Sequence, residues 1–206
     1  MYETHWRLYD EGRFPRHHQR HGRGGFFALE RLVLPQSEPV TLEEMKRHLR
    51  CQDDINILDD DISALIVTAR EWAENFTDRA LMEQTWRLTI DDGLMLKLHR
   101  SPIVSILSVK SIAKGGARTL IDSSEYRVEE SASISPQLIR TTPTHTLIEV
   151  EFVAGFSTAA EVPAIFKTAM KLYVQALFDL DQYMMDKLIA VAEASLRPAR
   201  ACLQLS

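Results

Sequence analysis

The first group of residues that could bind a metal ion is a cluster of aspartates. Five lie close together in the sequence: Asp53, Asp54, Asp59, Asp60 and Asp61. Carboxylate oxygens are preferred ligands of Ca²⁺ and Mg²⁺, but an EF-hand loop also needs alternating ligands, a mid-loop glycine and a closing glutamate. This stretch has none of these features. We therefore interpret the aspartates as caps and charge partners of the helix that follows them.

A second group contains three histidines nearer the N-terminus. His17 and His21 stand four residues apart, with His18 between them, and two imidazoles at this spacing bind zinc when they lie on a helix. No third ligand stands at a fixed spacing, and the glycines that follow disfavour a rigid helix. We therefore predict neither a bound metal nor a cofactor.

Motifs of nucleophilic catalysis and of nucleotide binding do not occur. The sequence contains no G-x-S-x-G elbow and no G-x-x-x-x-G-K-[ST] loop. The K-G-G-A segment at 114–117 lies between strand-like stretches, so it is predicted to be a hairpin tip and not a phosphate cradle. Trp72 and Trp86 are interpreted as core or interface anchors, not as ligand stackers. We predict that the chain is not an enzyme; a triad assembled from distant segments stays open.

A basic segment stands on a chain that is otherwise acidic. Between Gly12 and Phe27 there are four arginines and no acidic residue: Arg13, Arg16, Arg20 and Arg23. Arginine suits contact with a nucleic-acid backbone, and it equally suits bidentate pairing with an acidic protein surface. A solvated flexible tail is the third interpretation. The sequence does not decide among the three.

Composition is typical of soluble globular proteins. The 206 residues are 45% hydrophobic and 26% charged, with a net charge of −5, and a chain of this length can bury a core without staples. The negative charge argues against a surface built throughout to coat nucleic acid. No apolar run approaches the ~20 residues of a membrane span, and no secretory signal is apparent, so we expect no membrane partner. Cys51 and Cys202 lie far apart, which favours a reducing compartment.

Hydrophobic periodicity predicts an arm followed by helices. Residues 1–40 show no sustained period and are predicted to be an extended N-terminal arm. The T-L-E-E sequence from Thr41 is a capping box, and apolar residues spaced i, i+3, i+4, i+7 and i+11 from Ile62 indicate an amphipathic helix. Proline at 163 suits the first turn of a later helix and Pro198 ends another. The four predicted helices cover 42–50, 60–78, 163–180 and 183–196.

Between the second and third of these helices, over 84–156, the period changes to two. Trp86, Leu88 and Ile90 alternate with polar residues, and Leu94, Leu96 and Leu98 follow after D-D-G, which predicts a hairpin. Further strands are predicted at 103–112, 126–129, 137–140 and 146–153. The predicted fold class is therefore α+β: a small bundle of about four helices, with an antiparallel β insertion and the arm. The folded domain covers 41–196, and residues 197–206 form a C-terminal tail.

Seven segments, which together span about two thirds of the chain, resemble one known family. They are T-L-E-E-M-K-R-H-L-R at 41–50, D-D-D-I-S-A-L-I-V-T-A-R-E-W-A-E-N-F-T-D-R-A-L at 59–81, Q-T-W-R-L-T-I-D at 84–91, L-H-R-S-P-I-V-S-I-L-S-V at 98–109, Y-R-V at 126–128, E-V-E-F-V-A-G-F at 149–156 and V-P-A-I-F-K-T-A-M at 162–170. The family is that of the head–tail connectors of long-tailed phages, also called head-completion or adaptor proteins, which occurs in gene transfer agents too.

The resemblance implies a structural protein that works as a ring. Members of the family are helical bundles with a β insertion, and they assemble beneath the portal and extend the DNA channel toward the tail. Expected partners are the portal protein, a tail-side connector or stopper protein, further copies in a homo-oligomeric ring, dodecameric in the particle, and double-stranded DNA that passes without sequence readout. The expected location is the virion neck, after synthesis in the bacterial host cytoplasm. The residues alone give no subunit number.

The resemblance also implies where partners bind. The C-terminal tail is expected to reach the portal, with Leu196, Arg197, Arg200, Leu203 and Leu205 as the docking residues, while the β insertion faces the tail. Deleting 197–206 is expected to leave the fold intact and to abolish portal attachment. For contacts between copies we expect the exposed side of the sheet and the flanks of helices two and three. The arm is longer than the family core needs, so the resemblance says nothing of its role.

One alternative function remains from a different class. A small nucleic-acid-binding or DNA-packaging accessory protein could use the segment from Arg13 to Arg23 as its electrostatic footprint. A gel shift at moderate salt distinguishes the two, because a connector is expected to let DNA pass without binding it tightly.

Overall fold

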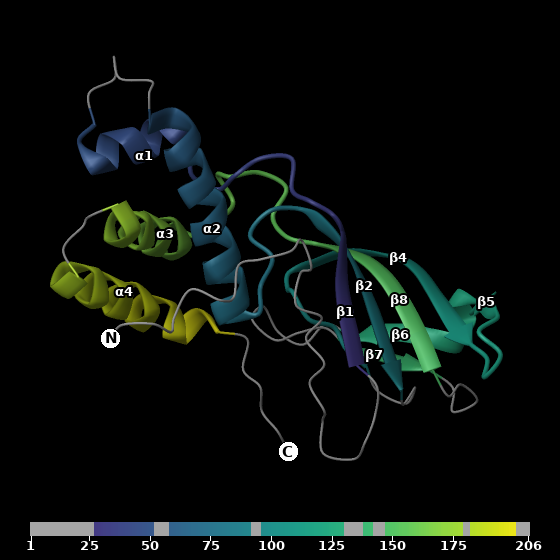
Figure 1. Cartoon of the computed structure of the whole chain (residues 1–206). Coiled ribbons are helices and arrows are strands. Elements are labelled where there is room, and N and C mark those ends of the chain that lie inside the picture. The colour runs from purple at the N-terminus through teal and green to yellow at the C-terminus, as the bar shows by residue number, and fades with distance from the viewer. Residues whose placement is uncertain are drawn as a thin grey trace, which may run out of the picture.

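The computed structural model describes residues 27–51, 58–91, 96–129, 138–141, 147–178 and 182–200. These residues form a helical bundle beside a β region (Figure 1). The chain starts in the β region with β1, enters the bundle with α1 and α2, returns to the β region, and ends in the bundle with α3 and α4. The predicted α+β class, with the β insertion between the second and third helices, is confirmed.

All four predicted helices are confirmed to within two residues at each end. They are α1 (Leu42–Leu49), α2 (Asp59–Thr77), α3 (Ala164–Phe178) and α4 (Gln182–Leu196). The capping box is present as well: Thr41 Oγ1 accepts from the Glu44 amide at 3.1 Å, and Glu44 Oε2 accepts from the Thr41 amide at 3.3 Å. Two backbone donors at the start of α1 are thus satisfied, which fixes where the helix begins.

The start of α2 differs from the prediction in one respect. Its N-cap residue is Leu58, and no side chain caps this end by a hydrogen bond, so the aspartates are not caps. Asp59, Asp60 and Asp61 lie inside the first turn, where negative charge favours the helix dipole. Asp59 also pairs with Lys46 Nζ at 2.7 Å and so ties α1 to α2. Asp53 and Asp54 lie outside the described residues.

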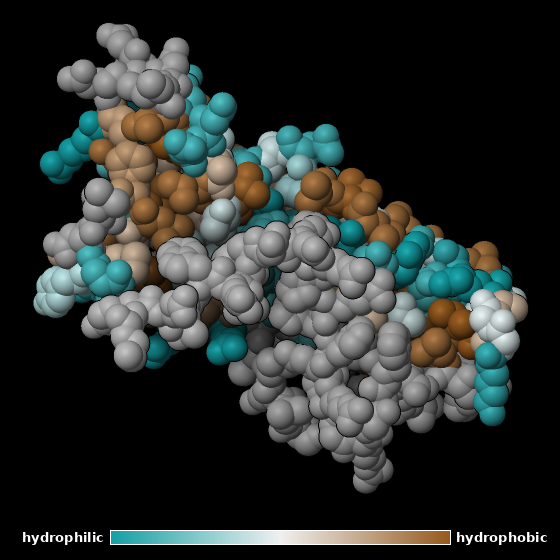
Figure 2. Space-filling view, viewed as in Figure 1, coloured by the Kyte–Doolittle hydropathy of each residue, from teal (hydrophilic) through white to brown (hydrophobic). Residues whose placement is uncertain are grey.

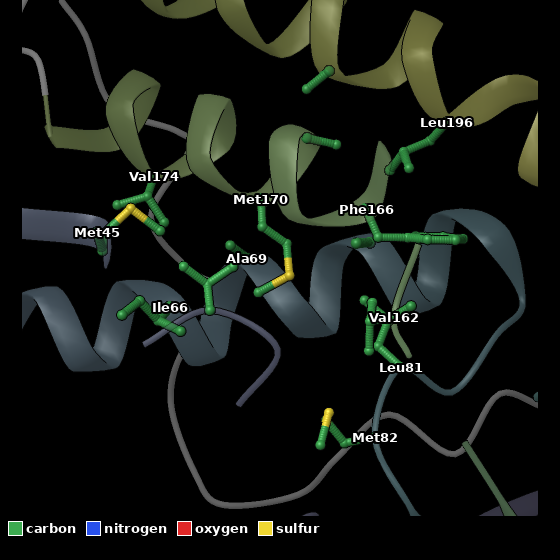
Figure 3. Packing of buried hydrophobic residues seen from close by; sticks show 14 of the residues in the cluster. Met45, Ile66, Ala69, Leu81, Met82, Val162, Phe166, Met170, Val174 and Leu196 are labelled. Carbon is green, nitrogen blue, oxygen red and sulfur yellow. The ribbon is translucent and has the colours of Figure 1, made fainter. Parts of the chain in front are cut away.

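The bundle encloses the first of two hydrophobic cores. Side chains from α2 and α3 interdigitate, and Leu196 of α4 packs against Phe166 and its neighbours (Figure 3). Met45 of α1 and Val40, which precedes α1, are fully buried in the same cluster. The core therefore joins segments separated by the whole β insertion, which makes the two halves of the bundle dependent on each other.

The β region is built of two antiparallel sheets. The larger has the order β1-β2-β8-β4-β5, with bounds Phe27–Val33, Gln84–Asp91, Leu147–Ala154, Ile103–Ile112 and Arg118–Leu120. The smaller has the order β3-β7-β6, with bounds Leu96–Lys97, Leu138–Thr141 and Tyr126–Glu129. The four strands predicted after residue 100 are confirmed as β4, β6, β7 and β8. Leu96 and Leu98 from the small sheet's side meet Leu88, Val150 and Phe152 of the large sheet in the second core.

The predicted hairpin between 84–91 and 94–98 is wrong. β2 is flanked on both sides, by β1 and β8, while β3 pairs with β7 in the other sheet. Alternating apolar residues correctly indicated two strands that bury one face each, but alternation carries no information about which strand lies alongside. Both strands bury that face in one core, from opposite sheets.

The predicted arm is also too long at its C-terminal end. Residues 27–33 form β1, an edge strand that pairs with β2. Glu38 then pairs with Arg70, and Val40 lies in the bundle core. Folded structure thus begins by Phe27 and not at residue 41. Residues 1–26 lie outside the described residues.

Candidate functional site

A buried carboxylate joins the bundle to the large sheet. Glu74 of α2 is 2% exposed, and its Oε1 accepts from the Leu81 amide at 2.9 Å and from Gln84 Nε2 at 2.6 Å. Its Oε2 accepts from Arg70 Nη1 at 2.9 Å. Arg70 also donates from Nε to Glu38 Oε2 at 2.8 Å. Protein donors occupy both Glu74 oxygens, an arrangement that suits a structural joint better than a catalytic base.

Two further arginines extend this joint around Trp86 of β2. Arg31 of β1 donates to Gln84 Oε1 at 3.2 Å and to Glu71 Oε1 at 2.5 Å, and its guanidinium lies 5.6 Å from the centre of the Trp86 ring. Arg100 lies 4.9 Å from that ring and donates to the Glu74 carbonyl at 2.8 Å. Both contacts are within the range of cation–π attraction. Trp86 is therefore a core anchor, as predicted.

Burial and charge act in opposite directions on the ionisable groups of this joint. Burial raises the pKa of Glu38, against the lowering effect of Arg70. Burial alone lowers the pKa of Arg70, but the charges of Glu74, Glu38 and Glu71 outweigh it and leave the pKa raised. For Arg100 burial dominates, and its pKa is lowered. The Arg70 charge is thus held in place by its acidic neighbours, so removing one of them leaves a poorly compensated buried cation.

The outer face of the large sheet, which points away from the small sheet, carries a ladder of ion pairs. Glu149 of β8 is 2% exposed and lies 3.7 Å from Arg87, 3.6 Å from Lys110 and 3.1 Å from Arg118. Its neighbour Glu151 accepts from Arg87 Nη2 at 2.8 Å. The ladder crosses β2, β8, β4 and β5, and its two carboxylates offset two of its three cations. This half of the outer face is therefore polar but nearly balanced.

Nearer the bundle the outer face carries several apolar side chains. Val33, Thr85, Val153 and Ser105 stand in register across four strands. Three irregularities in strand register lie beside this row, and the residue skipped at each is large, apolar and exposed: Leu32, Val104 and Leu107. A β-bulge changes the direction in which a side chain points, and bulges are common at sheet edges and beside functional sites. Figure 2 shows this as brown atoms over the end of the sheet nearer the bundle.

The predicted docking tail is partly fixed to the bundle. Leu196 is fully buried in the first core, so its side chain is unavailable to a partner while the bundle is folded. Arg79 Nε donates to the Ala199 carbonyl at 2.8 Å, and the Arg200 guanidinium lies 5.5 Å from the Phe76 ring centre. Arg197 and Arg200 are exposed. Leu203 and Leu205 lie outside the described residues.

Of the other residues singled out in the sequence, some lie within the described structure and some lie outside it. Trp72 stacks on Tyr173 with ring centres 4.3 Å apart, which joins α2 to α3 as a core anchor does. The arm arginines Arg13, Arg16, Arg20 and Arg23, and the three arm histidines, are outside the described residues. Within the described part of the chain, no group of three or more histidine, cysteine or acidic residues is placed to hold a metal ion. The helices that the structure describes are all too short or too polar to cross a membrane.

Sequence reasoning missed the joint around Glu74 and the apolar side chains of the outer face. The i,i+4 spacing of Arg70 and Glu74 on a predicted helix was a signal for one ion pair. Nothing in the sequence indicated that Arg31 and Arg100, far away in the chain, would meet at the same place. Leu107 lies inside a run that was correctly predicted as a strand, but bulges are not visible in an apolar pattern.

Comparison with known proteins rests on structure, because no protein-family model matches the sequence and no curated protein matches it either. A chain in the neck of an empty gene transfer agent (GTA) particle, computed with C6 symmetry, superposes with a TM-score of 0.67 at 18% identity. A chain in the virion of a native GTA particle gives 0.66 at 18%, and one in a native GTA neck computed with C12 symmetry gives 0.60 at 17%. Each match covers 86% of this chain and 97% of the other. The protein thus shares, over 86% of its length, the fold of a chain found in gene transfer agent necks.

Proposed function

We propose that this protein is a structural head–tail connector subunit of a phage or phage-like particle. Copies form a ring under the portal, extend the DNA channel, and provide the attachment site for tail-side proteins. The observation that carries the proposal is the fold shared with a chain of gene transfer agent necks, because it covers 97% of that chain and leaves no large part of it unmatched. The seven sequence segments that resemble the connector family support the same conclusion.

The distribution of polar groups supports a role without chemistry. The buried cluster around Glu74 uses its hydrogen-bonding groups to join α2 to the sheet. The surfaces that stay exposed are broad faces of a sheet and of helices, which suit contacts with other proteins. Both features support a structural, non-catalytic role.

Passage of DNA through a ring requires a lumen that does not hold the phosphates. A net charge of −5 suits such a lumen, because like charges keep the duplex from sticking. If the arm with Arg13 to Arg23 lined the channel, the isolated arm would bind DNA with a strong dependence on salt. We expect a gel shift with the whole protein at moderate salt to show no stable complex. A salt-sensitive complex would favour the alternative of a packaging accessory protein.

Electron microscopy of the protein alone and mixed with portal rings tests the proposal. We expect ring-shaped densities stacked on one end of the portal, coaxial with its channel. Portal rings that stay bare at saturating concentrations of the protein would contradict the connector role. A portal from an unrelated particle serves as the control, because specific docking requires matched surfaces.

A further inference from the structure

The large sheet has an unpaired edge on each side. Its strand order places β1 at one end, and no described strand pairs with the far side of β1. At the other end β5 pairs with β4 only over residues 110–112, and the Ile121 amide donates to the Val109 carbonyl. Residues 103–108 of β4 therefore have an open side within the described part of the chain. Figure 1 shows β1 and β4 on opposite sides of β2 and β8.

The open part of β4 has the composition of a strand that pairs with another. Its sequence, I-V-S-I-L-S-V at 103–109, contains no charged residue, proline or glycine. Lysine and proline are the residues that discourage pairing at exposed edges, and uncharged segments of six or seven residues with high β propensity pair readily with other strands. Val104 and Leu107, at the two bulges, are 51% and 56% exposed. The bulges twist this edge, which limits pairing to a strand of matching shape.

β1 is suited to be the strand that pairs there. Its sequence, F-A-L-E-R-L-V at 27–33, has no net charge and no proline, and Leu32 and Val33 are 37% and 49% exposed. Val33 on β1 and Ser105 on β4 stand in one row across the sheet. The exposed apolar residues of the two edges therefore lie at the same level, and a second β1 placed beside β4 at this level brings Val33 next to Val104.

Strand direction favours the next copy of this chain as the source of that second β1. The pairs β1–β2, β2–β8 and β8–β4 are all antiparallel, so β1 and β4 run in opposite directions. Neighbours in a ring are related by rotation, and each copy offers different surfaces to the copies before and after it. A rotation about an axis near the strand direction preserves that direction. β1 of the next copy then arrives antiparallel to β4 and continues the pattern of the sheet, whereas a two-fold axis would bring like edges together.

Charge is complementary between the two edges. Glu30 is the acid of β1, and its side chain is 65% exposed, with a long 3.4 Å pair to Arg87. The charged residues of β4 and β5 are both bases, Lys110 and Arg118, and the Arg118 side chain is 56% exposed. Glu30 shares a row with Ser108 of β4. Continuing this row into the next copy places its Glu30 beside Ser108 and diagonal to Lys110, a spacing that long side chains can bridge.

We propose that β1 of one copy pairs with residues 103–108 of β4 in the next copy, and so extends the large sheet from copy to copy. The inference rests on the proposed ring and deepens it by naming the two edges that meet. Backbone hydrogen bonds supply the contact, as they do where a peptide adds a strand to a sheet. Val33, Val104 and Leu107 bury apolar surface beside these bonds. The contact uses the sheet, as expected for neighbouring copies, while contact through the flanks of α2 and α3 stays a prediction.

Hydrogen–deuterium exchange of the whole chain tests the contact, because it reports on backbone hydrogen bonds. The chain is measured at low concentration, where it is unassembled, and again when assembled at high concentration or on portal rings. We expect assembly to slow exchange in both 27–33 and 103–108. Residues 84–91 of β2 are the control, since they are already paired on both sides. Rings in which 103–108 is slowed without 27–33 would overturn the inference, because another segment or protein would then fill the edge. Rings in which neither segment is slowed would overturn it as well.

Variants at the two edges give an independent test. Val104→Lys places a charge at the open edge of β4, and Val33→Lys does the same on β1. Each variant alone is expected to stay monomeric by native mass spectrometry, and to leave portal rings without a closed ring by electron microscopy. An equimolar mixture is expected to form dimers and nothing larger, because one intact pair of edges remains. Val191→Lys on α4 is the matched control, since Val191 is 50% exposed, and it should assemble as the unchanged chain does.

The outcomes separate this contact from the ring itself. Rings of Val104→Lys or Val33→Lys like those of the unchanged chain would overturn the inference and leave the ring proposal standing. Dimers of either variant alone would also overturn it, because they indicate pairing of like edges. Melting curves check that the variants are folded, and the exchange measurement decides the question without any variant. Failure of the unchanged chain to assemble, both alone and on portal rings, would instead contradict the ring.

Discussion

Glu74 of α2 accepts hydrogen bonds from its own helix, from the segment that follows the helix, and from β2 of the large sheet. It contacts Arg70, the Leu81 amide and Gln84 while 2% exposed. Removing one partner of a buried pair leaves the other charge without compensation. We expect Glu74→Ala to lower the free energy of unfolding by about 3 to 5 kcal/mol in urea titrations. Glu43→Ala, at an exposed carboxylate in the first turn of α1, should cost no more than about 1 kcal/mol. Equal effects of the two substitutions would contradict the joint.

Glu151 should make stability depend on pH in the acid range. Its hydrogen bond from Arg87, followed by the charges of Lys110 and Arg87, holds its pKa below the ordinary glutamate value. A group whose pKa is lowered by folding stabilises the protein above its unfolded pKa, and this contribution is lost as the pH falls through the folded pKa. The melting temperature of Glu151→Gln is therefore expected to fall less steeply than that of the unchanged protein as the pH is lowered. Parallel curves for the two proteins would show that Arg87 contributes nothing to this dependence.

Among the elements, the end of β8 depends on one glycine. Gly155 has φ of 122°, and a Cβ placed there would lie 2.1 Å from the Met82 carbonyl oxygen. Backbone cannot move aside as a flexible side chain can, and that φ is strained for any L-residue. We expect Gly155→Ala to cost about 2 to 4 kcal/mol by chemical denaturation. Gly115→Ala is the matched control, because nothing lies within 4 Å of its added Cβ. A cost at Gly115 as large as that at Gly155 would refute this account.

Elements could be predicted from the sequence where one residue pattern determines one structure. The capping box at Thr41 and the apolar periods that follow placed the helices to within two residues. Pairing could not be predicted, because β2 and β3 show the same alternation although they lie in different sheets. β1 was missed because Arg31 stands at an inward position, where it binds Glu71 and Gln84. From the sequence alone, a charged residue in a strand is interpreted as facing solvent, because its buried partners are not known.

For the candidate contact surfaces the sequence was less informative than for the fold. Exposed apolar residues such as Leu107 and Val104 have the same types as core residues, so composition cannot separate them. The tail residue Leu196 shows the reverse error, since it was expected to dock and is buried in the core. Which side of an element is left uncovered is decided by the packing of distant segments.

At the scale of the whole molecule, the C-terminal segment has two parts: residues 197–200, which the structure describes, and residues 201–206, which it does not. Ala199 packs on the bundle core and accepts from Arg79, so residues 197–200 contribute to the fold. We expect deletion of 197–206 to lower the melting temperature by several degrees, because the buried Arg79 loses the Ala199 carbonyl as an acceptor. Deletion of 201–206 should leave the melting temperature unchanged. If the tail docks on the portal, the shorter deletion alone should abolish co-purification with portal rings. Retained binding would place the portal contact elsewhere.

The central claim is that many copies of this protein stand together at the particle neck. The most direct test counts and locates the chain in purified particles, by quantitative mass spectrometry against the portal protein and by cryo-electron microscopy of the neck. The connector role predicts a stoichiometry equal to that of a complete ring, with density for the bundle and both sheets adjoining the portal. A solitary copy per particle, or copies located away from the neck, would contradict it.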